Sequence, residues 1–409
     1  MTPPKNPDPE SPVPGISRNV FILGITSFLT DLSSEIVYPL VPLFLTSVLG
    51  APFAVVGLIE GIAESTASIL KVYSGWLSDR MPRRRPLTII GYGISAVAKP
   101  LLAAAFAWPM VLALRFGDRL GKGIRVAPRD ALIADSSEPA TRGRVFGFHR
   151  AADTAGASLG ALLALVALAL IGERYRTIFL LSAIPGALGV VSLFFIRERK
   201  RDHSHGHPPR LSLSQFDRRF KLFLLASAIF AIGNSSDAFI ILRARDLGLS
   251  AMAAVFAYVI YNLVYGVFSM PAGSLSDRIG RRRVIAAGFL VFSLVYLGFA
   301  LAGDSMAVWP LFTIYGLYMA MTEGVGKAFV ADMAPREAAG TALGTYNTLT
   351  GILTFFSSLT AGLLWDAAGA RTPFFFGAAT GLTAMLVLLM AMRQNPGPAT
   401  PVPNTHNPL

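Results

Sequence analysis

Carboxyl groups occur in pairs within stretches of the chain that are otherwise apolar. Asp31 and Glu35 stand four residues apart, and Glu60 and Glu64 repeat this spacing. Residues four apart lie on the same face of an α-helix, one turn from each other. Two carboxyls held together away from water are the arrangement that a proton carrier requires. We therefore predict that these residues bind and release protons, with a structural ion pair between helices as the alternative for each of them.

Basic side chains form a stripe at helical spacing further along the chain. Its members are Arg115, Arg119, Lys122 and Arg129, with Asp118 and Asp130 near its edges. Such cations suit an anionic solute or the carboxyls of a neighbouring helix. The residues predicted to line a central cavity and couple it to protons are Asp31, Glu35, Glu60, Glu64, Arg119, Lys122, Asp153, Glu323 and Lys327. For Glu323 and Lys327, one turn apart, a structural ion pair is an equally good interpretation.

Tyrosine and amide side chains share one face of a later apolar stretch. Tyr258, Tyr261, Asn262 and Tyr265 follow helical spacing there, and in a repeat alignment Glu60 and Glu64 correspond to Tyr258 and Asn262. The first half of the chain therefore resembles a charged, coupling half, and the second half an aromatic and amide wall. The predicted wall consists of Tyr38, Arg115, His149, Tyr258, Tyr261, Asn262 and Tyr265. Ordinary helix packing is the alternative for the tyrosines.

The elements that position these residues are membrane-spanning helices. Of the 409 residues, 53% are hydrophobic and 15% are charged, whereas a soluble domain carries about 25% charged residues. Apolar runs of about 20 residues, the length that crosses a bilayer as a helix, recur along the chain. A charge at the centre of the bilayer costs about 2.5–3.5 kcal/mol on an insertion scale. The charged residues must therefore pair or line a watered cavity.

We predict an all-α polytopic membrane protein with twelve transmembrane helices in two pseudo-symmetric six-helix bundles. The bundles cover 19–196 and 220–393, joined by a polar cytoplasmic linker at 197–219 and flanked by disordered cytoplasmic tails at 1–18 and 394–409. The predicted spans are 19–48, 54–78, 86–106, 109–134, 144–171, 177–196, 220–245, 252–275, 284–302, 307–331, 341–367 and 372–392. Pro39 and Pro42 are expected to kink the first helix, and Gly156 and Gly160 to allow close packing.

The net charge of +12 comes from arginines in short loops. Arg83–Arg85 and Arg281–Arg283 illustrate the excess of basic residues typical of cytoplasmic loops, so nucleic-acid binding is not predicted. We expect both termini in the cytoplasm and the protein in the inner (plasma) membrane of a bacterium. The chain has no cysteine, which excludes disulfides and thiolate metal sites.

Two segments of the chain are repeated. Gly75-Trp-Leu-Ser-Asp79-Arg80-Met-Pro-Arg83-Arg84-Arg85 returns as Gly273-Ser-Leu-Ser-Asp277-Arg278-Ile-Gly-Arg281-Arg282-Arg283, and Ala131-Leu-Ile-Ala-Asp135 returns as Ala328-Phe-Val-Ala-Asp332. Duplicated six-helix units with a substrate site between them are known among transporters.

These paired motifs resemble the loop after the second helix in the major facilitator superfamily, and the resemblance covers almost all of residues 18–393. It implies tight packing at the glycine and a cytoplasmic charge pair that opens during transport. By that resemblance the gate residues are Gly75, Asp79, Arg80 and Arg84, with Gly273, Asp277 and Arg278 as weaker counterparts. Arg119 to Gly123 resembles the family's Arg-x-x-x-Gly pattern linked to proton coupling. Pro82 and Arg125 depart from the family motifs, and the Gly-Pro pair of its antiporter pattern is missing after Gly156.

His203, His205 and His207 alternate within the central linker. We interpret them as part of a solvated linker, with nickel or zinc binding as the weaker alternative. No cofactor and no other metal site is predicted.

The residues together predict a secondary active transporter that works by alternating access, as a monomer, with protons as the coupling ion. No phosphate-binding loop and no catalytic motif occurs, so neither ATP drive nor an enzyme is expected. We favour proton-coupled antiport that exports a drug or metabolite. Proton-linked uptake or exchange of an organic anion is the first alternative, and a transport-inactive receptor or scaffold is the second.

Overall fold

A computed structural model describes residues 13–137, 141–198, 216–334 and 339–391, and all of its regular elements in these ranges are helices. The predicted all-α fold is therefore confirmed. His203, His205 and His207 lie outside the described residues, as does the side chain of Asp79.

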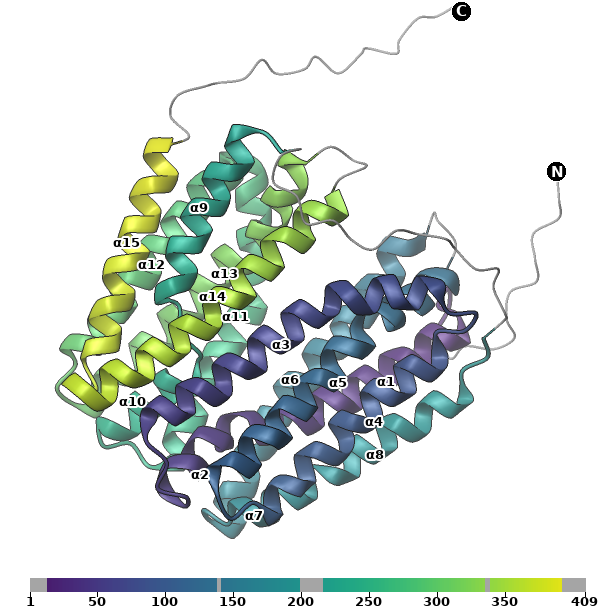
Figure 1. The fold of residues 1–409 in the computed structure, drawn as a ribbon, viewed down its shortest axis with the longest axis horizontal. Helices are drawn as coiled ribbons and strands as arrows, with labels where there is room; N and C mark the ends of the chain where they lie inside the picture. The colour runs from purple at the N-terminus through teal and green to yellow at the C-terminus, as the bar shows by residue number, and fades with distance from the viewer. Residues whose placement is uncertain (1–12, 138–140, 199–215, 335–338, 392–409) are drawn as a thin grey trace, which may run out of the picture.

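The first half contains helical segments that run alternately from one end of the molecule to the other (Figure 1). They are α1 (Arg18–Val37), η1 (Tyr38–Leu40), α2 (Val41–Ser47), α3 (Phe53–Arg80), α4 (Arg85–Leu101), η2 (Leu102–Ala104), α5 (Trp108–Asp135), α6 (Arg142–Ile171), α7 (Tyr175–Leu181), α8 (Ala183–Ser192) and η4 (Leu193–Phe195). The 3-10 segment η1 contains Pro39, and Pro42 follows at the start of α2, which confirms the predicted irregularity in the first helix.

The second half repeats this arrangement. Its segments are α9 (Arg218–Gly233), α10 (Ala238–Asp246), α11 (Ala251–Ile279), α12 (Arg281–Leu301), η5 (Ser305–Ala307), α13 (Val308–Met333), α14 (Ala339–Ala368) and α15 (Thr372–Ala391). Ten helical segments among the described residues are long and apolar enough to cross a membrane. The long helices α5 and α13 pack between them and raise the number of membrane-length segments in the described chain to twelve.

Local signals in the sequence begin and end several helices. Ser17, Asp217 and Ser250 cap α1, α9 and α11 by accepting hydrogen bonds from backbone N–H groups of the first turn. Such caps satisfy donors that a helix start leaves unpaired. Gly280, at φ 96°, ends α11 in a conformation that favours glycine.

Each half packs mainly on itself, and an arginine–aspartate pair lies in corresponding segments of the two halves, although the arginine differs by one repeat position. In the first half, the Arg84 guanidinium pairs with Asp135 at 2.7 Å. In the second half, Arg281 pairs with Asp332, which is the repeat counterpart of Asp135. We call the end of the molecule that contains these two arginine–aspartate pairs the basic end. The opposite end is called the far end.

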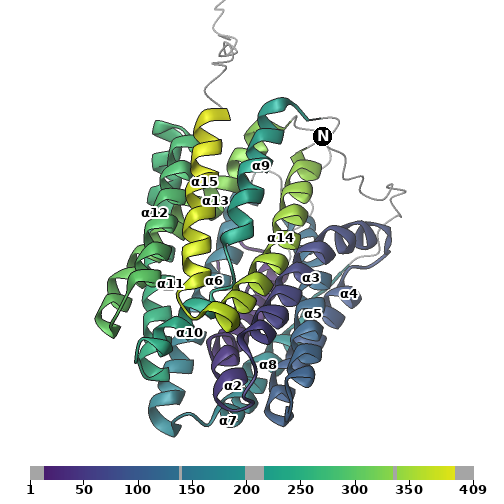
Figure 2. The same ribbon diagram turned by 60° about the vertical axis from the view of Figure 1, so that its left-hand side comes forward.

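The two halves meet along α3 and α14, which lie side by side in Figures 1 and 2. Gly57 makes this contact possible, because a Cβ there would lie 2.1 Å from the backbone oxygen of Ser358. Within the first half, a Cβ on Gly156 or Gly160 would lie 2.2 or 2.5 Å from a backbone oxygen of α1. The close packing predicted for these two glycines is therefore confirmed.

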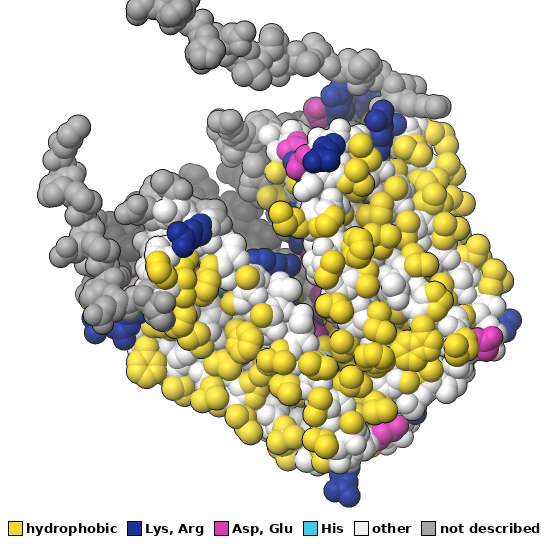
Figure 3. All heavy atoms as spheres, turned by 180° about the vertical axis from the view of Figure 1, so that it is seen from behind, with side chains coloured by type: hydrophobic (Ala, Val, Ile, Leu, Met, Phe, Trp, Pro, Cys, Tyr) yellow, Lys and Arg dark blue, Asp and Glu magenta, His cyan; other side chains and the backbone are white. Residues whose placement is uncertain are grey.

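Direct bonds join the halves at the far end. The Asp366 carboxylate accepts hydrogen bonds from the backbone N–H groups of Phe53 (3.1 Å) and Ala54 (2.7 Å) at the start of α3. The rings of Phe53 and Trp365 stack with centroids 4.5 Å apart. Towards the basic end the bundles diverge, and Figure 3 shows a hollow between them with basic and acidic side chains in its walls. The structure is thus closed at the far end and open at the basic end.

Candidate functional site

A small cavity of about 70 Å³ lies at the centre of the first half. Its charged and polar lining comes from three segments that the sequence keeps far apart: α1 with η1, α4 and α5. The charged and phenolic lining residues are Asp31, Glu35, Tyr38, Lys99, Arg115, Asp118, Arg119 and Lys122. We call this space the central cavity.

Two ion pairs join α3 to α5 beside this cavity. The Arg115 Nη2 atom lies 2.8 Å from each carboxylate oxygen of Glu60, and both residues are almost completely buried. One turn on, the Arg119 guanidinium lies 3.3 Å from Glu64. The predicted meeting of the acidic face of α3 with the cationic stripe of α5 is therefore observed. Neutralisation of this kind is what permits buried charges in a membrane helix.

Tyr38 and Asp118 complete this charged layer. The Tyr38 ring lies 5.5 Å from the Arg115 guanidinium and 5.8 Å from that of Arg119, within range of cation–π attraction. Asp118 lies 3.8 Å from Arg115 and 3.9 Å from Arg119. Both arginines are therefore held by partners on three sides, which fixes their position in the cavity wall.

Asp31 and Glu35 are in a different situation. Both line the central cavity, and neither forms an ion pair within the described chain. Glu35 accepts a 2.8 Å hydrogen bond from the hydroxyl of Tyr258, which belongs to α11 in the other half. Tyr258 also lies next to Tyr38, with ring centroids 6.0 Å apart. Glu35 therefore sits where the two halves touch at the level of the cavity.

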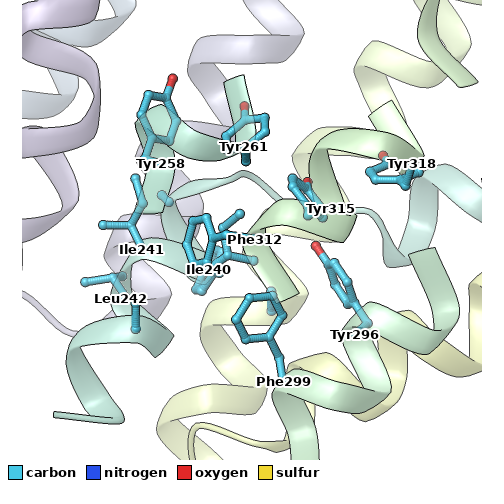
Figure 4. Close-up of a cluster of buried hydrophobic side chains, with 14 of the residues drawn as sticks. Ile240, Ile241, Leu242, Tyr258, Tyr261, Tyr296, Phe299, Phe312, Tyr315 and Tyr318 are labelled. Carbon is cyan, nitrogen blue, oxygen red and sulfur yellow. The ribbon is translucent and has the colours of Figure 1, made fainter. Parts of the chain in front are cut away.

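The three tyrosines of the predicted wall that belong to α11 all donate to carboxylates. Besides the bond from Tyr258 to Glu35, Tyr261 donates to Asp237 at 2.5 Å and Tyr265 donates to Glu323 at 2.7 Å. In Figure 4 the hydroxyls of Tyr258, Tyr261 and Tyr315 all point away from the segment from Ile240 to Leu242. Tyr315 adds a second hydrogen bond to Asp237, at 2.7 Å. The face predicted on α11 is thus a row of hydroxyls that bind acidic residues.

Two other predictions on this side concern Asn262 and the Glu323–Lys327 pair. The Asn262 amide donates to the Tyr258 carbonyl of its own helix at 3.0 Å. The Lys327 ammonium lies 3.0 Å from Glu323, as expected for residues one turn apart. Because Tyr265 also binds Glu323, this carboxylate is neutralised and hydrogen-bonded at once.

His149 and Asp153 belong to a second polar group, between α1, α4, α5 and α6. His149 Nε2 lies 2.8 Å from the Ser27 hydroxyl, which is also 3.0 Å from that of Tyr92. Asp153 lies 3.9 Å from both His149 Nδ1 and Arg129. His149 is therefore held inside the first half by Ser27 of α1, and its place in the substrate wall stays a prediction.

The predicted gate residues lie at the basic end. Arg84 is buried and holds Asp135, while Asp277 lies 3.4 Å from Arg281 rather than pairing with Arg278. Arg80 and Arg278 are exposed. A Cβ on Gly75 would make an ordinary 3.5 Å contact with Ala127, and one on Gly273 would meet nothing within 4 Å. The tight packing implied for these glycines is therefore absent in this conformation, because the basic ends of the halves stand apart.

Two charged groups, the buried Lys99 and the half-buried Asp237, escaped the sequence analysis. Lys99 donates to the Ser34 hydroxyl at 3.0 Å and lines the central cavity, but its place near the end of a span resembles that of an interfacial lysine. Asp237 is the repeat counterpart of Glu35, and the weak echo of Ser33-Ser34-Glu35 in Ser235-Ser236-Asp237 was the available signal. No cluster of three or more histidine, aspartate or glutamate side chains suited to a metal ion occurs in the ranges that the structure describes.

Comparison with known proteins places these features in a wider group. The family model of the Major Facilitator Superfamily matches residues 23–243 and 222–409. An uncharacterized MFS-type transporter of Methanocaldococcus jannaschii is 37% identical over 380 residues, covering 91% of this chain and 95% of the relative. The multidrug resistance protein MdtH of Salmonella newport is 24% identical over 80% of this chain and 82% of its own. The crystal structure of a POT family transporter in complex with 5-aminolevulinic acid has a TM-score of 0.77 at 14% identity, over 91% of this chain and 95% of that one.

Proposed function

The chain belongs to the major facilitator superfamily and is a secondary membrane transporter rather than an enzyme, and we propose that it is a proton-coupled antiporter that exports a small organic solute through the central cavity. The resemblance to a protein named for multidrug resistance supports export of this kind. The arginine-rich loops support an orientation with the basic end and both termini in the cytoplasm. In that orientation the structure is open to the cytoplasm.

The hydrogen bond between Glu35 and Tyr258 is the observation on which the proposal rests. It joins the two halves at 2.8 Å through a carboxyl that has no ion-pair partner in the described chain. Asp31, one turn away, is similarly unpaired and lines the same cavity. Glu60 and Glu64, in contrast, are neutralised by arginines. The coupling function predicted for all four acidic residues is therefore best assigned to Asp31 and Glu35.

Protonation of Glu35 would change the strength of the contact between the halves. A hydrogen bond to an ionised acceptor is roughly twice as strong as one between neutral groups. Ionised Glu35 therefore favours the far-end-closed state seen here. A solute that binds at the ionised cavity from the basic end displaces this bond, so the far end opens, the solute leaves and a proton binds Glu35. The protonated, empty carrier returns and releases the proton at the basic end, where the ionised carboxylate binds Tyr258 again. Solute and proton thus move in opposite directions, which is antiport.

The experiment uses purified full-length protein in liposomes that report internal pH. Cationic drugs, organic anions and metal ions are added in turn, and proton movement is compared in wild type, Glu35→Gln and Asp31→Asn. Asp304→Asn is the matched control, since Asp304 caps η5 at the far end. We expect one class of solute to drive proton movement in wild type and control but in neither cavity variant. Solute transport with no proton movement would exclude coupling, and no transport of any class by correctly inserted protein would favour a receptor or scaffold.

Uptake or exchange of an organic anion is the second candidate, favoured by Lys122. This side chain lines the central cavity without a hydrogen bond or ion pair in the described structure. An anionic solute would supply the missing partner. Transport by an anion site should be lost in Lys122→Ala and Arg119→Ala, whereas export of a cation should depend on Asp31 and Glu35. The solute class that moves in the liposome assay, together with these variants, separates the two candidates.

A further inference from the structure

A second cavity, of about 160 Å³, lies inside the carboxy-terminal half. Its lining comes from α9 with the following Asn234, α12, α13 and α14, and none of its lining residues belongs to the central cavity. The lining contains aromatic rings, hydroxyls and one amide; its members include Phe223, Phe230, Phe289, Tyr318 and Tyr346. This space is therefore separate from the charged site on which the proposed function rests.

The aromatic walls are preformed. The rings of Phe230 and Phe289 stack with centroids 4.2 Å apart and an interplanar angle of 11°. Phe223 and Tyr346 are nearly parallel as well, with centroids 5.9 Å apart at 14°. Aromatic side chains favour further rings in stacked or edge-on contact. The walls consequently suit a flat aromatic occupant that fits between rings already fixed by their neighbours.

Two polar atoms in this lining have no hydrogen-bond partner within the described structure: Ser227 Oγ and Asn234 Oδ1. Ser227 is only 4% exposed. Leaving a buried polar group unsatisfied costs about 1–3 kcal/mol. The Asn234 oxygen can only accept a hydrogen bond, so its missing partner is a donor. Glu323, the charged residue of the lining, already binds Lys327 and Tyr265 and does not call for a cation.

The volume limits the size of the occupant. An apolar protein cavity of about 150 Å³ is large enough to bind benzene. We propose that the cavity inside the carboxy-terminal half is a binding site for one neutral aromatic ring that carries a hydrogen-bond donor, as phenol and aniline do. The ring packs against Phe230 and Phe223, and its donor satisfies Asn234 or Ser227. The site goes beyond the proposed function, because it lies within one half and does not depend on proton coupling.

The test measures binding of 4-fluorophenol by ¹⁹F NMR to the full-length protein in lipid nanodiscs, with empty nanodiscs as the blank for partition into lipid. Fluorobenzene is the probe without a donor. Ala231→Phe fills the cavity, since Ala231 is buried in its lining. Ile232→Phe is the matched control, because Ile232 is exposed and outside the lining.

We expect wild type and Ile232→Phe to bind 4-fluorophenol about fivefold more tightly than fluorobenzene, as one net hydrogen bond of about 1 kcal/mol requires. Ala231→Phe should bind neither probe. Ser227→Ala and Asn234→Ala add no bulk and each remove one of the two acceptors; one of these variants should weaken 4-fluorophenol binding about threefold or more, and both should leave fluorobenzene binding unchanged. Binding no greater than in empty nanodiscs would show a cavity filled by water and overturn the proposal. Equal binding by Ala231→Phe, or equal affinity for both probes, would overturn it as well.

Discussion

Glu35 in α1 and Tyr258 in α11 are 223 residues apart in the chain and share a 2.8 Å hydrogen bond between carboxylate and hydroxyl. The bond crosses from one half of the transporter to the other at the level of the central cavity. Nearby, Tyr38 contacts both the Tyr258 ring and the cavity arginines. A change at the cavity can therefore reach the junction between the halves through a single side chain.

Tyr258→Phe should weaken this junction. Loss of one hydrogen bond to an ionised carboxylate, about 1.5–3 kcal/mol, lowers the ratio of far-end-closed to far-end-open molecules roughly tenfold or more. The chain has no native cysteine, so spin labels at Val48→Cys and Met306→Cys, both exposed at the far end, report the distance between the halves by pulsed electron resonance. We expect a larger open population in Tyr258→Phe and a weaker response to pH than in the wild-type background.

Tyr265→Phe is the control for this measurement, because Tyr265 donates to Glu323 within the same half. It should leave the distance distribution as in wild type. A distribution that Tyr258→Phe does not change would contradict a conformational function of the Glu35 bond.

Gly57→Ala should open the far end by a steric route. The new Cβ would lie 2.1 Å from the Ser358 backbone oxygen, far inside van der Waals contact, so α3 and α14 must separate. Gly93→Ala is the matched control, since a Cβ at this helical glycine meets nothing within 4 Å and should stabilise α4 slightly through helix propensity. The same spin-label pair should show an increased distance for Gly57→Ala alone. An unchanged distance would mean that α3 and α14 accommodate the new methyl group without separating at the far end.

Much of the fold follows from simple patterns in the sequence. The spans are predictable because hydrocarbon fixes the length of an apolar helix, and the pairing of Arg119 with Glu64 follows from two polar faces that must avoid lipid. Periodicity states which way a residue points on its own helix but not which helix lies opposite. Lys99 and Asp237 were missed for this reason: their partners, Ser34 and the pair Tyr261 and Tyr315, come from other segments.

The neighbours of His149 could not be predicted for the same physical reason. Its position one turn from Asp153 was correct, but the neighbours that hold it, Ser27 and Tyr92, come from α1 and α4. Gly75 illustrates a different limit. A motif implies a contact without stating in which conformation it forms, and the open basic end leaves Gly75 and Gly273 without close neighbours.

Asp366→Ala should loosen the far end without a change in the cavity. The Asp366 carboxylate binds the N–H groups of Phe53 and Ala54, where it satisfies unpaired donors and complements the positive end of the α3 dipole. Removal of such a cap costs about 0.5–2 kcal/mol. Asp366→Asn keeps an acceptor but not the charge and should lie between alanine and wild type. The readout is modification of a single cysteine at Val48, which should be fastest in Asp366→Ala; equal rates in all three would argue against this contact as part of the closure.

The Glu60–Arg115 pair should behave as a buried ion pair in which each charge depends on the other. Arg115 contacts both oxygens of Glu60 at 2.8 Å, and both side chains are almost fully buried. Removing one partner leaves the other charge buried and unpaired, which lowers the free energy of unfolding by about 3–5 kcal/mol. Replacing both partners with apolar residues often leaves that free energy unchanged. Thermal unfolding of purified protein should therefore show large losses for Glu60→Leu and Arg115→Leu and a much smaller loss for the double variant. The double-mutant cycle formed by these variants should give a coupling energy of several kcal/mol if no other residue compensates either charge. Additive losses would instead mean that Asp118, 3.8 Å from Arg115, or water compensates the remaining charge, and the two residues would then be free to separate during transport.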